Sequence, residues 1–248
     1  VVIILKSQSE IELIRSSCKI VSEILQTLGS KVAPGITTEE LDKLAGQMIQ
    51  KYGGKPAPPE VGFPGNICVS INEQVVHGVP SKRSLKSGDI VSIDVTASFN
   101  GYYGDVAATF PVGKISEKAQ HLLDITKRSL SEGIKKAIDG NRLGDISYTI
   151  QSYVEKHGFS VVRNFVGHGI GKEMWEEPQI PNFGFPDRGP RIKKGMVFAI
   201  EPMVNIGAYE VRVLDDGWTA VTQDGSLSAH FEHTVAILDN GAEILTFS

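Results

Sequence analysis

The chain has 248 residues, of which 41% are hydrophobic and 22% are charged, and its formal net charge is −4. This length is sufficient for one large domain with a substantial buried core, and the composition is that of an ordinary globular protein. The slight negative charge, without a basic stripe interleaved with aromatic residues, gives no reason to expect nucleic acid as a direct partner. Two cysteines are too few to cross-link a chain of this size, so we expect a reducing compartment.

The hydrophobic start of the chain, residues 1–5, ends at Lys6 and is too short for a signal peptide or a membrane span. No later stretch of the sequence reaches spanning length. We therefore expect a cytoplasmic protein with no membrane partner.

Hydrophobic periodicity predicts alternating helical and strand segments. A helix is expected over residues 11–28, ended by Gly29, and a capping-box pattern opens a second helix over residues 37–49. Glycines and prolines predict a loop over residues 53–64. Strands are then expected at 67–71, 90–97 and 106–112, helices at 117–137 and 145–156, and strands at 161–165, 197–200, 208–213, 219–221 and 234–238. No low-complexity linker separates these segments, so we expect a single domain over residues 1–248.

The chain contains an internal repeat. Glycines enclose a helical pattern with the same spacing at residues 35–53 and 140–158. Residues 85–94 also align without gaps to residues 192–201. In both aligned segments an apolar residue, a lysine and a glycine precede a strand that ends in isoleucine and an acid. Two such matches in the same order predict two related halves.

Four acids adjoin strongly apolar strands, where a carboxylate is costly unless it is paired or binds a cation. Asp94 and Glu201 end the two aligned segments, Asp105 precedes a strand-like run, and Glu232 lies at the start of another. Exposed strand ends or salt-bridge partners are the alternative interpretation. The repeat favours a carboxylate site between the two halves.

Two histidines are candidates for the same site. His168 lies between Gly167 and Gly169, where close backbone approach suits a ligand in a tight pocket, although a histidine in a glycine-rich turn is the alternative. His77 ends an apolar strand before Gly78, and a structural role is as compatible with this pattern as a functional one.

Together, the motifs of this chain resemble those of a type I methionine aminopeptidase, a member of the pita-bread metallopeptidases. The resemblance extends from about residue 11 to residue 245. The motifs are Ser70-Ile71-Asn72-Glu73, His77-Gly78-Val79-Pro80, Gly88-Asp89-Ile90-Val91, Gly101-Tyr102-Tyr103-Gly104-Asp105, Gly167-His168-Gly169-Ile170-Gly171, Ala199-Ile200-Glu201-Pro202, Asp216-Gly217-Trp218-Thr219-Ala220 and Phe231-Glu232-His233-Thr234. The resemblance implies an α+β fold, in which duplicated helix-plus-strand halves surround a curved, mainly antiparallel sheet.

The resemblance also implies that five residues hold two divalent metal ions, namely Asp94, Asp105, His168, Glu201 and Glu232. Asp105 and Glu232 would bridge the ions, and Glu201 would also transfer the catalytic proton. Four carboxylates and one imidazole suit divalent Co, Mn, Fe or Zn, and two such ions would neutralise the clustered negative charge.

The implied activity is removal of the N-terminal methionine from nascent polypeptides, with a small second residue preferred. His77 would be catalytic, donating to the peptide bond that is cut. The substrate-binding residues would be His77, Phe63, Cys68, Met174, Trp175 and Trp218. Core packing is the alternative role for Phe63 and Cys68. The resemblance further suggests a monovalent cation, Na or K, held by backbone oxygens of Asn72, Gln74 and Ser228. The ribosome is a candidate partner, and we expect a monomer.

Two positions depart from the family pattern. Trp175 replaces a histidine that would hydrogen-bond the scissile carbonyl, and an indole has one N–H donor and no acceptor. We therefore hypothesise a slowed or specificity-shifted enzyme. Glu60 replaces an aromatic residue at the pocket rim, where it would either face solvent or disfavour an apolar substrate side chain.

Two other functions remain as alternatives. One is a proline-directed aminopeptidase or dipeptidase of the same fold, although such enzymes usually have an additional N-terminal domain. The other is a catalytically impaired member that binds proteins, which would be expected to lose metal ligands, whereas all five ligand positions are intact here.

Overall fold

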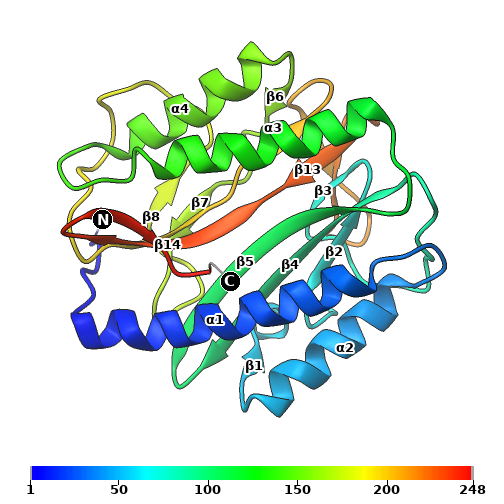
Figure 1. Cartoon of the computed structure of the whole chain (residues 1–248), viewed down its shortest axis with the longest axis horizontal. Helices are drawn as coiled ribbons and strands as arrows, with labels where there is room; N and C mark the ends of the chain where they lie inside the picture. Colours follow the sequence, from blue (N-terminus) through cyan, green and yellow to red (C-terminus); the bar gives the residue numbers. More distant parts are fainter. Residues whose placement is uncertain (1, 247–248) are drawn as a thin grey trace.

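The computed structural model describes residues 2–246 and has an α+β architecture, as the sequence predicts. Figure 1 shows helices α1 and α2 below the strands and helices α3 and α4 above them. The helices are α1 (Gln8–Lys31), α2 (Thr38–Lys51), the 3-10 helix η1 (Pro58–Val61), α3 (Glu117–Ile134) and α4 (Leu143–Lys156). The strands are β1 (Lys55–Pro56), β2 (Cys68–Ile71), β3 (Gln74–Val76), β4 (Ile90–Phe99), β5 (Tyr102–Pro111), β6 (Ser160–Val161), β7 (Gly167–Gly169), β8 (Glu176–Ile180), β9 (Val197–Ile200), β10 (Met203–Asn205), β11 (Val211–Val213), β12 (Ala220–Thr222), β13 (Ser228–His230), β14 (Glu232–Leu238) and β15 (Gly241–Ile244).

The main sheet has nine strands, and its central path runs in the order β1-β4-β5-β14-β9-β7-β8. Every paired strand in this sheet is antiparallel to its neighbour. Two smaller sheets, β13-β10-β6 and β11-β12-β3, complete the strand arrangement. The two halves of the chain therefore meet where β5 pairs with β14.

Short-range polar contacts determine where the first two helices begin. Ser7 caps α1 and Thr37 caps α2, and in each case a glutamate at the third helical position reaches back to the cap residue. This reciprocal arrangement satisfies backbone N–H groups that lack partners within the helix. The capping box predicted for the second helix is thus confirmed.

The internal repeat corresponds to repeated structure. Helices α2 and α4 each contain 14 residues and lie within the two matched glycine intervals. Strands β4 and β9 each follow a glycine with positive φ, which is 100° at Gly88 and 88° at Gly195. L-residues with side chains rarely adopt this conformation, so the two matched glycines permit the same turn into a central strand.

Each helix pair covers its own part of the sheet with a separate hydrophobic core. Residues of α1 and α2 pack with Val91, Ile93 and Val95 of β4, whereas residues of α3 and α4 pack with β9 and β14. Because side chains alternate across a strand, the even-numbered residues of β4 point away from these helices. This places Asp94 and Thr96 on the face opposite the helical layer.

Several sequence-predicted elements differ from the structure. Asp94 and Asp105 were expected at strand ends, and this was wrong: both lie inside the ten-residue strands β4 and β5. A polar residue interrupts the apolar run of a strand without ending its alternation or its pairing. Of the strand expected at 161–165, only Val161 lies in a strand. The segment expected as a loop at 53–64 contains β1 and η1. The apolar strand expected before Gly78 is β3, whereas strands β7, β8, β10, β13 and β15 were not predicted, because each of them is short.

Each helix of the described residues is too short or too polar to cross a membrane.

Candidate metal centre

Strand register brings three carboxylates to one face of the main sheet. Asp94 on β4 and Glu232 on β14 pair with the same residue, Ala107, from opposite sides of β5. Asp105 lies two positions from Ala107 on β5, and therefore on the same face. Residues distant in sequence thus become neighbours through the pairing of β4, β5 and β14.

The second half of the chain contributes a histidine and a fourth carboxylate. His168 on β7 pairs with Ala199 on β9, and Glu201 directly follows β9. The His168 Nε2 atom lies 3.7 Å from Asp105 Oδ2 and 3.6 Å from Glu201 Oε1. Its Nδ1 atom lies 2.9 Å from the Gly169 carbonyl oxygen, so Nε2 is the ring nitrogen that faces the carboxylates.

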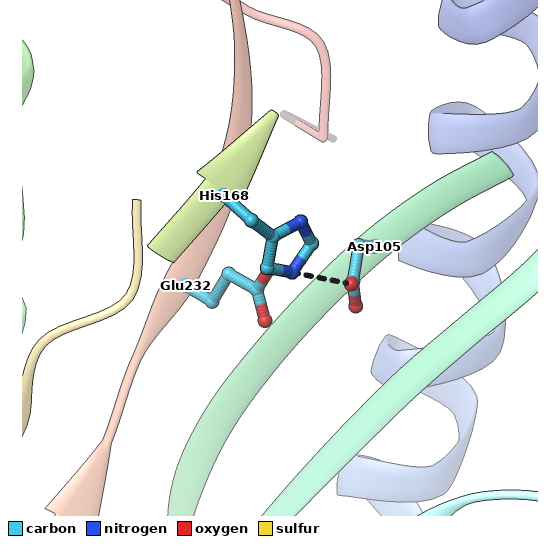
Figure 2. Close-up of side chains that lie close together, drawn as sticks. All are labelled: Asp105, His168 and Glu232. Carbon is cyan, nitrogen blue, oxygen red and sulfur yellow. Dashed lines mark ion pairs between the residues drawn. The ribbon is translucent and has the colours of Figure 1, made fainter. Parts of the chain in front are cut away.

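Two overlapping groups have the composition and spacing of metal-binding sites. Asp105, His168 and Glu232 each offer one ligand atom, and these atoms lie within 4.8 Å of one another. Figure 2 shows the three side chains together. Glu201, His230 and Glu232 satisfy the same criterion. Glu232 is common to both groups.

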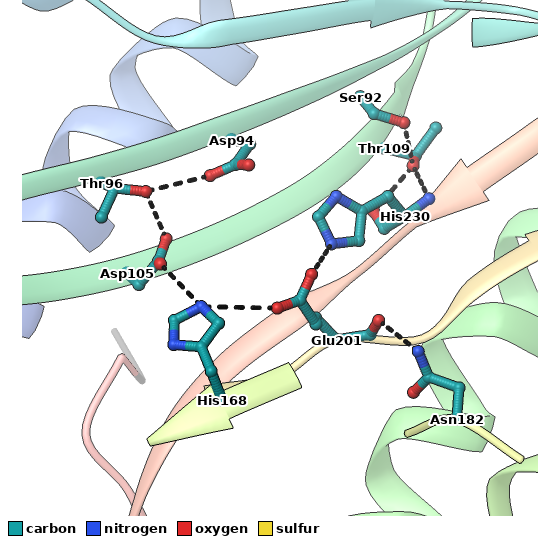
Figure 3. Close-up of polar contacts among 9 residues, drawn as sticks. All are labelled: Ser92, Asp94, Thr96, Asp105, Thr109, His168, Asn182, Glu201 and His230. Atoms are coloured by element: carbon teal, nitrogen blue, oxygen red, sulfur yellow. Dashed lines mark hydrogen bonds and ion pairs between the residues drawn. The ribbon is translucent and has the colours of Figure 1, made fainter. Parts of the chain in front are cut away.

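Asp94 lies beside these groups without belonging to either of them. The Thr96 hydroxyl is 2.7 Å from Asp105 Oδ1 and 3.4 Å from Asp94 Oδ1, so one side chain contacts both carboxylates (Figure 3). Four of the five predicted ligands therefore occur in the compact groups, and the fifth adjoins them. All five line one cavity.

Burial shifts the protonation equilibria of these groups. Desolvation raises the pKa of Asp94, and it raises the pKa values of Asp105, Glu201 and Glu232 well above their usual range, with further contributions from neighbouring carboxylates. Desolvation also lowers the pKa of His168 to about 4. The imidazole is thus neutral near pH 7, which is the form that binds metal.

The donor set fits divalent cations. Glu232 Oε1 and His230 Nε2 are buried and have no hydrogen-bond partner among the described residues. A buried polar atom without a partner is costly, and a bound cation would be a partner for both atoms. Carboxylate oxygens and imidazole nitrogens suit Mn, Fe, Co or Zn.

The predicted substrate residues meet in the same cavity, which has a volume of roughly 460 Å³. Its walls include His77, Phe63, Cys68, Met174, Trp175 and Trp218. The rings of Phe63 and Trp218 are perpendicular, with centroids 5.4 Å apart. Trp175 remains 56% exposed, so it lies where the cavity opens.

His77 is held at the cavity wall by an unusual backbone conformation and an aromatic neighbour. Its φ is 56°, and its ring stands edge-on to Phe165 with centroids 5.3 Å apart. Burial, with a smaller contribution from His230, lowers the pKa of His77 to about 4. Phe165 was not identified from sequence, because an isolated aromatic residue in an irregular segment carries no distinctive pattern.

Glu60 turns away from the cavity. It accepts a hydrogen bond from the Tyr103 hydroxyl and does not line the cavity wall. The expectation that it could face an apolar substrate side chain therefore lacks support, and the solvent-facing alternative agrees with its exposure.

The residues expected around a monovalent cation are close to one another. The Ser228 backbone N–H donates to the Asn72 carbonyl oxygen at 2.9 Å, and Gln74 Oε1 accepts from the Ile71 backbone N–H at 2.8 Å. Asn72 has a φ of 57°, which turns the chain sharply between β2 and β3.

His230 was not identified from the sequence. It ends β13, lies two residues before Glu232, and is 2% exposed. Its Nε2 atom is 3.4 Å from Glu201 Oε2 (Figure 3). Its proximity to Glu232 in sequence was the only available signal, since the direction of the side chain depends on how β13 joins the sheet.

The antiparallel main sheet with its duplicated halves and the buried group of acids and histidines fit a metallopeptidase. The family model described as metallopeptidase family M24 matches residues 12–239, and the chain belongs to this family. Within it, the chain belongs with the methionine aminopeptidases. It is 58% identical to "Methionine aminopeptidase" of Clostridium perfringens, over 98% of both chains, and 51% identical to "Methionine aminopeptidase 1" of Bacillus subtilis, over 98% of this chain and 99% of the relative. The expected family resemblance is confirmed.

Solved structures confirm the pita-bread fold. The methionine aminopeptidase of Thermotoga maritima superposes with a TM-score of 0.98 at 47% identity, over 100% of both chains. The prolidase of Pyrococcus furiosus superposes with a TM-score of 0.78 at 23% identity, over 99% of this chain and 66% of the prolidase. The second comparison shows a shared fold only.

Proposed function

We propose that this chain is a metal-dependent aminopeptidase that removes the N-terminal methionine from other polypeptides. The observation that carries the proposal is the convergence of Asp105, His168, Glu201 and Glu232, with Asp94 beside them, at one cavity. Full-length similarity to methionine aminopeptidases supports the same reaction. The proline-directed alternative is not favoured, because the prolidase likeness extends only to the fold.

The five side chains would hold two divalent ions, with Asp105 and Glu232 shared between them. Bound ions of this kind lower the pKa of a water molecule and polarise the carbonyl of the bond to be cut. The position of Glu232 in both ligand groups supports its bridging role. The proposed ions are Co, Mn, Fe or Zn, since the donor set does not distinguish among them.

Glu201 is the proposed proton carrier. Its Oε1 atom faces His168 and its Oε2 atom faces His230, so the two oxygens have different surroundings. In the metal-free protein, burial raises the pKa of this carboxyl group well above its usual range. Glu201 would accept a proton from the attacking water and deliver it to the departing amine.

His77 would orient the peptide bond. It lines the cavity and is neutral near pH 7, since its pKa is lowered to about 4. A neutral imidazole has one N–H donor and one acceptor, so it is able to donate to the substrate carbonyl or peptide nitrogen.

The apolar wall would bind the methionine side chain. Phe63, Cys68, Met174 and Trp218 present aromatic and sulfur-containing groups. Burial raises the pKa of the Cys68 thiol well above its ordinary value, so this group is uncharged. Soft and aromatic groups suit a thioether. Trp175, at the cavity opening, would contact the second substrate residue and favour a small one.

The remaining elements of the proposal concern the cellular setting. The N-termini of nascent chains would be the substrates, the ribosome would be a candidate docking partner, and the cytoplasm would be the compartment. The free cysteines Cys18 and Cys68 suit a reducing environment. A monovalent cation would lie near Asn72, Gln74 and Ser228. We propose that the enzyme acts as a monomer.

Peptide hydrolysis tests the proposed activity. Metal-free protein is loaded separately with Co²⁺, Mn²⁺, Fe²⁺ or Zn²⁺ and given Met-Ala-Ser, Leu-Ala-Ser, Phe-Ala-Ser and N-acetyl-Met-Ala-Ser. We expect free methionine from the first peptide and no cleavage of the acetylated one, because a blocked amine is not a free N-terminus. The Glu201→Gln variant serves as a control and should lose most activity. Protein that leaves Met-Ala-Ser uncut with every ion would support the impaired, protein-binding alternative instead.

A further inference from the structure

The side chain of His230 lies beside the proposed metal centre, and a role in core packing alone does not explain its surroundings. It is 2% exposed, and its Nε2 atom has no hydrogen-bond partner among the described residues. A histidine that serves only as core packing normally satisfies both ring nitrogens, because an unpaired buried polar atom costs about 1–3 kcal/mol. The nearby Glu201 Oε2, at 3.4 Å, does not complete a hydrogen bond with this nitrogen.

The main chain of His230 is held in place on both sides. Its backbone N–H donates to Thr109 Oγ1 at 2.9 Å, and its carbonyl accepts from the same hydroxyl at 2.9 Å. The Ser92 hydroxyl lies 2.8 Å from Thr109 Oγ1, which links the arrangement to β4 (Figure 3). Because the backbone is fixed in this way, the imidazole direction is preorganised before any ligand binds.

The imidazole points toward two carboxylates of the proposed centre. His230 Nε2 is 3.4 Å from Glu201 Oε2, and the ligand atoms of His230, Glu201 and Glu232 all lie within 4.8 Å of one another. Glu232 Oε1 is also buried without a hydrogen-bond partner. Two unpartnered atoms therefore belong to the same group of three, and a single cation would satisfy both.

The two halves of the centre become alike once His230 is included. Asp105, His168 and Glu232 form one group with an imidazole, and Glu201, His230 and Glu232 form another. The five-residue ligand set supplies only the imidazole of His168. Inclusion of His230 gives each group a nitrogen ligand and gives Glu232 the shared position.

We propose that His230 is a sixth protein ligand of the metal centre and binds through Nε2 the ion that Glu201 and Glu232 hold. This inference deepens the proposed activity and rests on that proposal for the presence of the ions. The competing role is a hydrogen bond from His230 to Glu201, which would position the carboxylate without contact to metal.

The variant His230→Gln separates these two roles. The glutamine amide retains an N–H donor for Glu201, but it lacks the imidazole nitrogen that binds Co²⁺ well. His233→Gln is the matched control, because His233 lies on the adjacent strand and its Nδ1 atom pairs with the Thr246 hydroxyl. Both variants remove one imidazole, and the two histidines lie three residues apart in the chain.

The readout is proton NMR of metal-free protein loaded with two equivalents of Co²⁺. A histidine bound to this paramagnetic ion shows its other ring N–H as an exchangeable resonance far outside the normal range. We expect two such resonances in the parent and in His233→Gln, and one in His230→Gln. Calorimetry should show one Co²⁺ bound more weakly in His230→Gln, by at least the 10–100-fold loss typical of removing a supporting group.

One shifted resonance in the parent protein would overturn the inference, as would two in His230→Gln with unchanged Co²⁺ affinity. If His230→Gln does not fold, the number of shifted resonances in the parent protein is sufficient to test the inference. Hydrolysis of Met-Ala-Ser by the same samples separates this inference from the proposed function. If the protein cleaves the peptide but has only one metal-bound imidazole, the proposed role of His230 alone is contradicted. If it has two metal-bound imidazoles but does not cleave the peptide, the proposed activity alone is contradicted.

Discussion

Asp94 and Glu201 occupy matched places in the two halves of the main sheet. Asp94 lies on β4 beside β5, Glu201 directly follows β9 beside β14, and β5 pairs with β14 between them. The sequence repeat ends in these two acids. The pairing of the halves therefore brings duplicated carboxylates to a single cavity, where burial raises both pKa values.

The tryptophan at the cavity opening is predicted to limit turnover. Trp175 has one N–H donor and no acceptor, whereas a histidine offers both. We expect Trp175→His to raise kcat/KM on Met-Ala-Ser, by up to about 10²-fold, the typical value of one donor to a developing oxyanion. Steady-state kinetics at saturating Co²⁺ provide the measurement. An unchanged kcat/KM would show that the indole does not slow the reaction.

The hydroxyl of Thr96 is predicted to orient two metal ligands. It lies 2.7 Å from Asp105 Oδ1 and 3.4 Å from Asp94 Oδ1. Thr96→Val preserves a β-branched side chain but removes this contact, so Co²⁺ affinity should fall by about 10–100-fold. Calorimetric titration of the metal-free variant measures the change. Thr126→Val, which removes a buried hydroxyl from α3, is the control and should retain the parent affinity.

Metal removal is predicted to make stability depend on pH. Burial raises the folded-state pKa values of Asp105, Glu201 and Glu232, so the folded protein retains protons that the unfolded chain releases. Their contribution to stability is full below the ordinary carboxyl pKa and is lost as pH rises through the raised values. Histidines with lowered pKa values act in the opposite direction, but only below the ordinary histidine value of 6.5.

Above pH 6.5 the Tm of metal-free protein should therefore fall as pH rises. Added Co²⁺ should raise Tm and reduce this dependence, with about 2.7 kcal/mol of stabilisation at 100 times the dissociation constant. Thermal melts across pH with and without a chelator make the comparison. Identical Tm values in both conditions would contradict a bound metal.

A buried ion pair is predicted to stabilise the segment that carries Trp175. Lys6 Nζ lies 2.5 Å from Glu176 Oε2, and the two side chains are 3% and 6% exposed. Lys6→Met leaves the Glu176 charge buried without its partner, which should lower the free energy of unfolding by about 3–5 kcal/mol. Denaturant titration measures the loss.

The control for this variant is Lys194→Met, which removes a surface pair with Asp239. Water screens that pair, so the free energy of unfolding should change little. Equal losses in Lys6→Met and Lys194→Met would show that burial of the Lys6 pair has no special effect.

The sequence by itself determined the family, the repeat and the identity of the carboxylates. Contiguous motifs such as Gly167-His168-Gly169 and Ala199-Ile200-Glu201 remain recognisable without coordinates. The capping box at Thr37 was also predictable from the sequence, because both of its contacts join residues three positions apart. Local signals of this kind depend only on neighbouring residues.

The tertiary structure alone decided which side chains face the cavity. Glu60 turns to Tyr103, Asp94 lies inside a strand rather than at its end, and His230 approaches Glu201. Each of these outcomes depends on how segments that are distant in the chain pack or pair, and for Asp94 the strand register decides it. A register shift of one residue would move each side chain of a strand to the opposite face of the sheet. No local pattern in the sequence predicts which strands will pair.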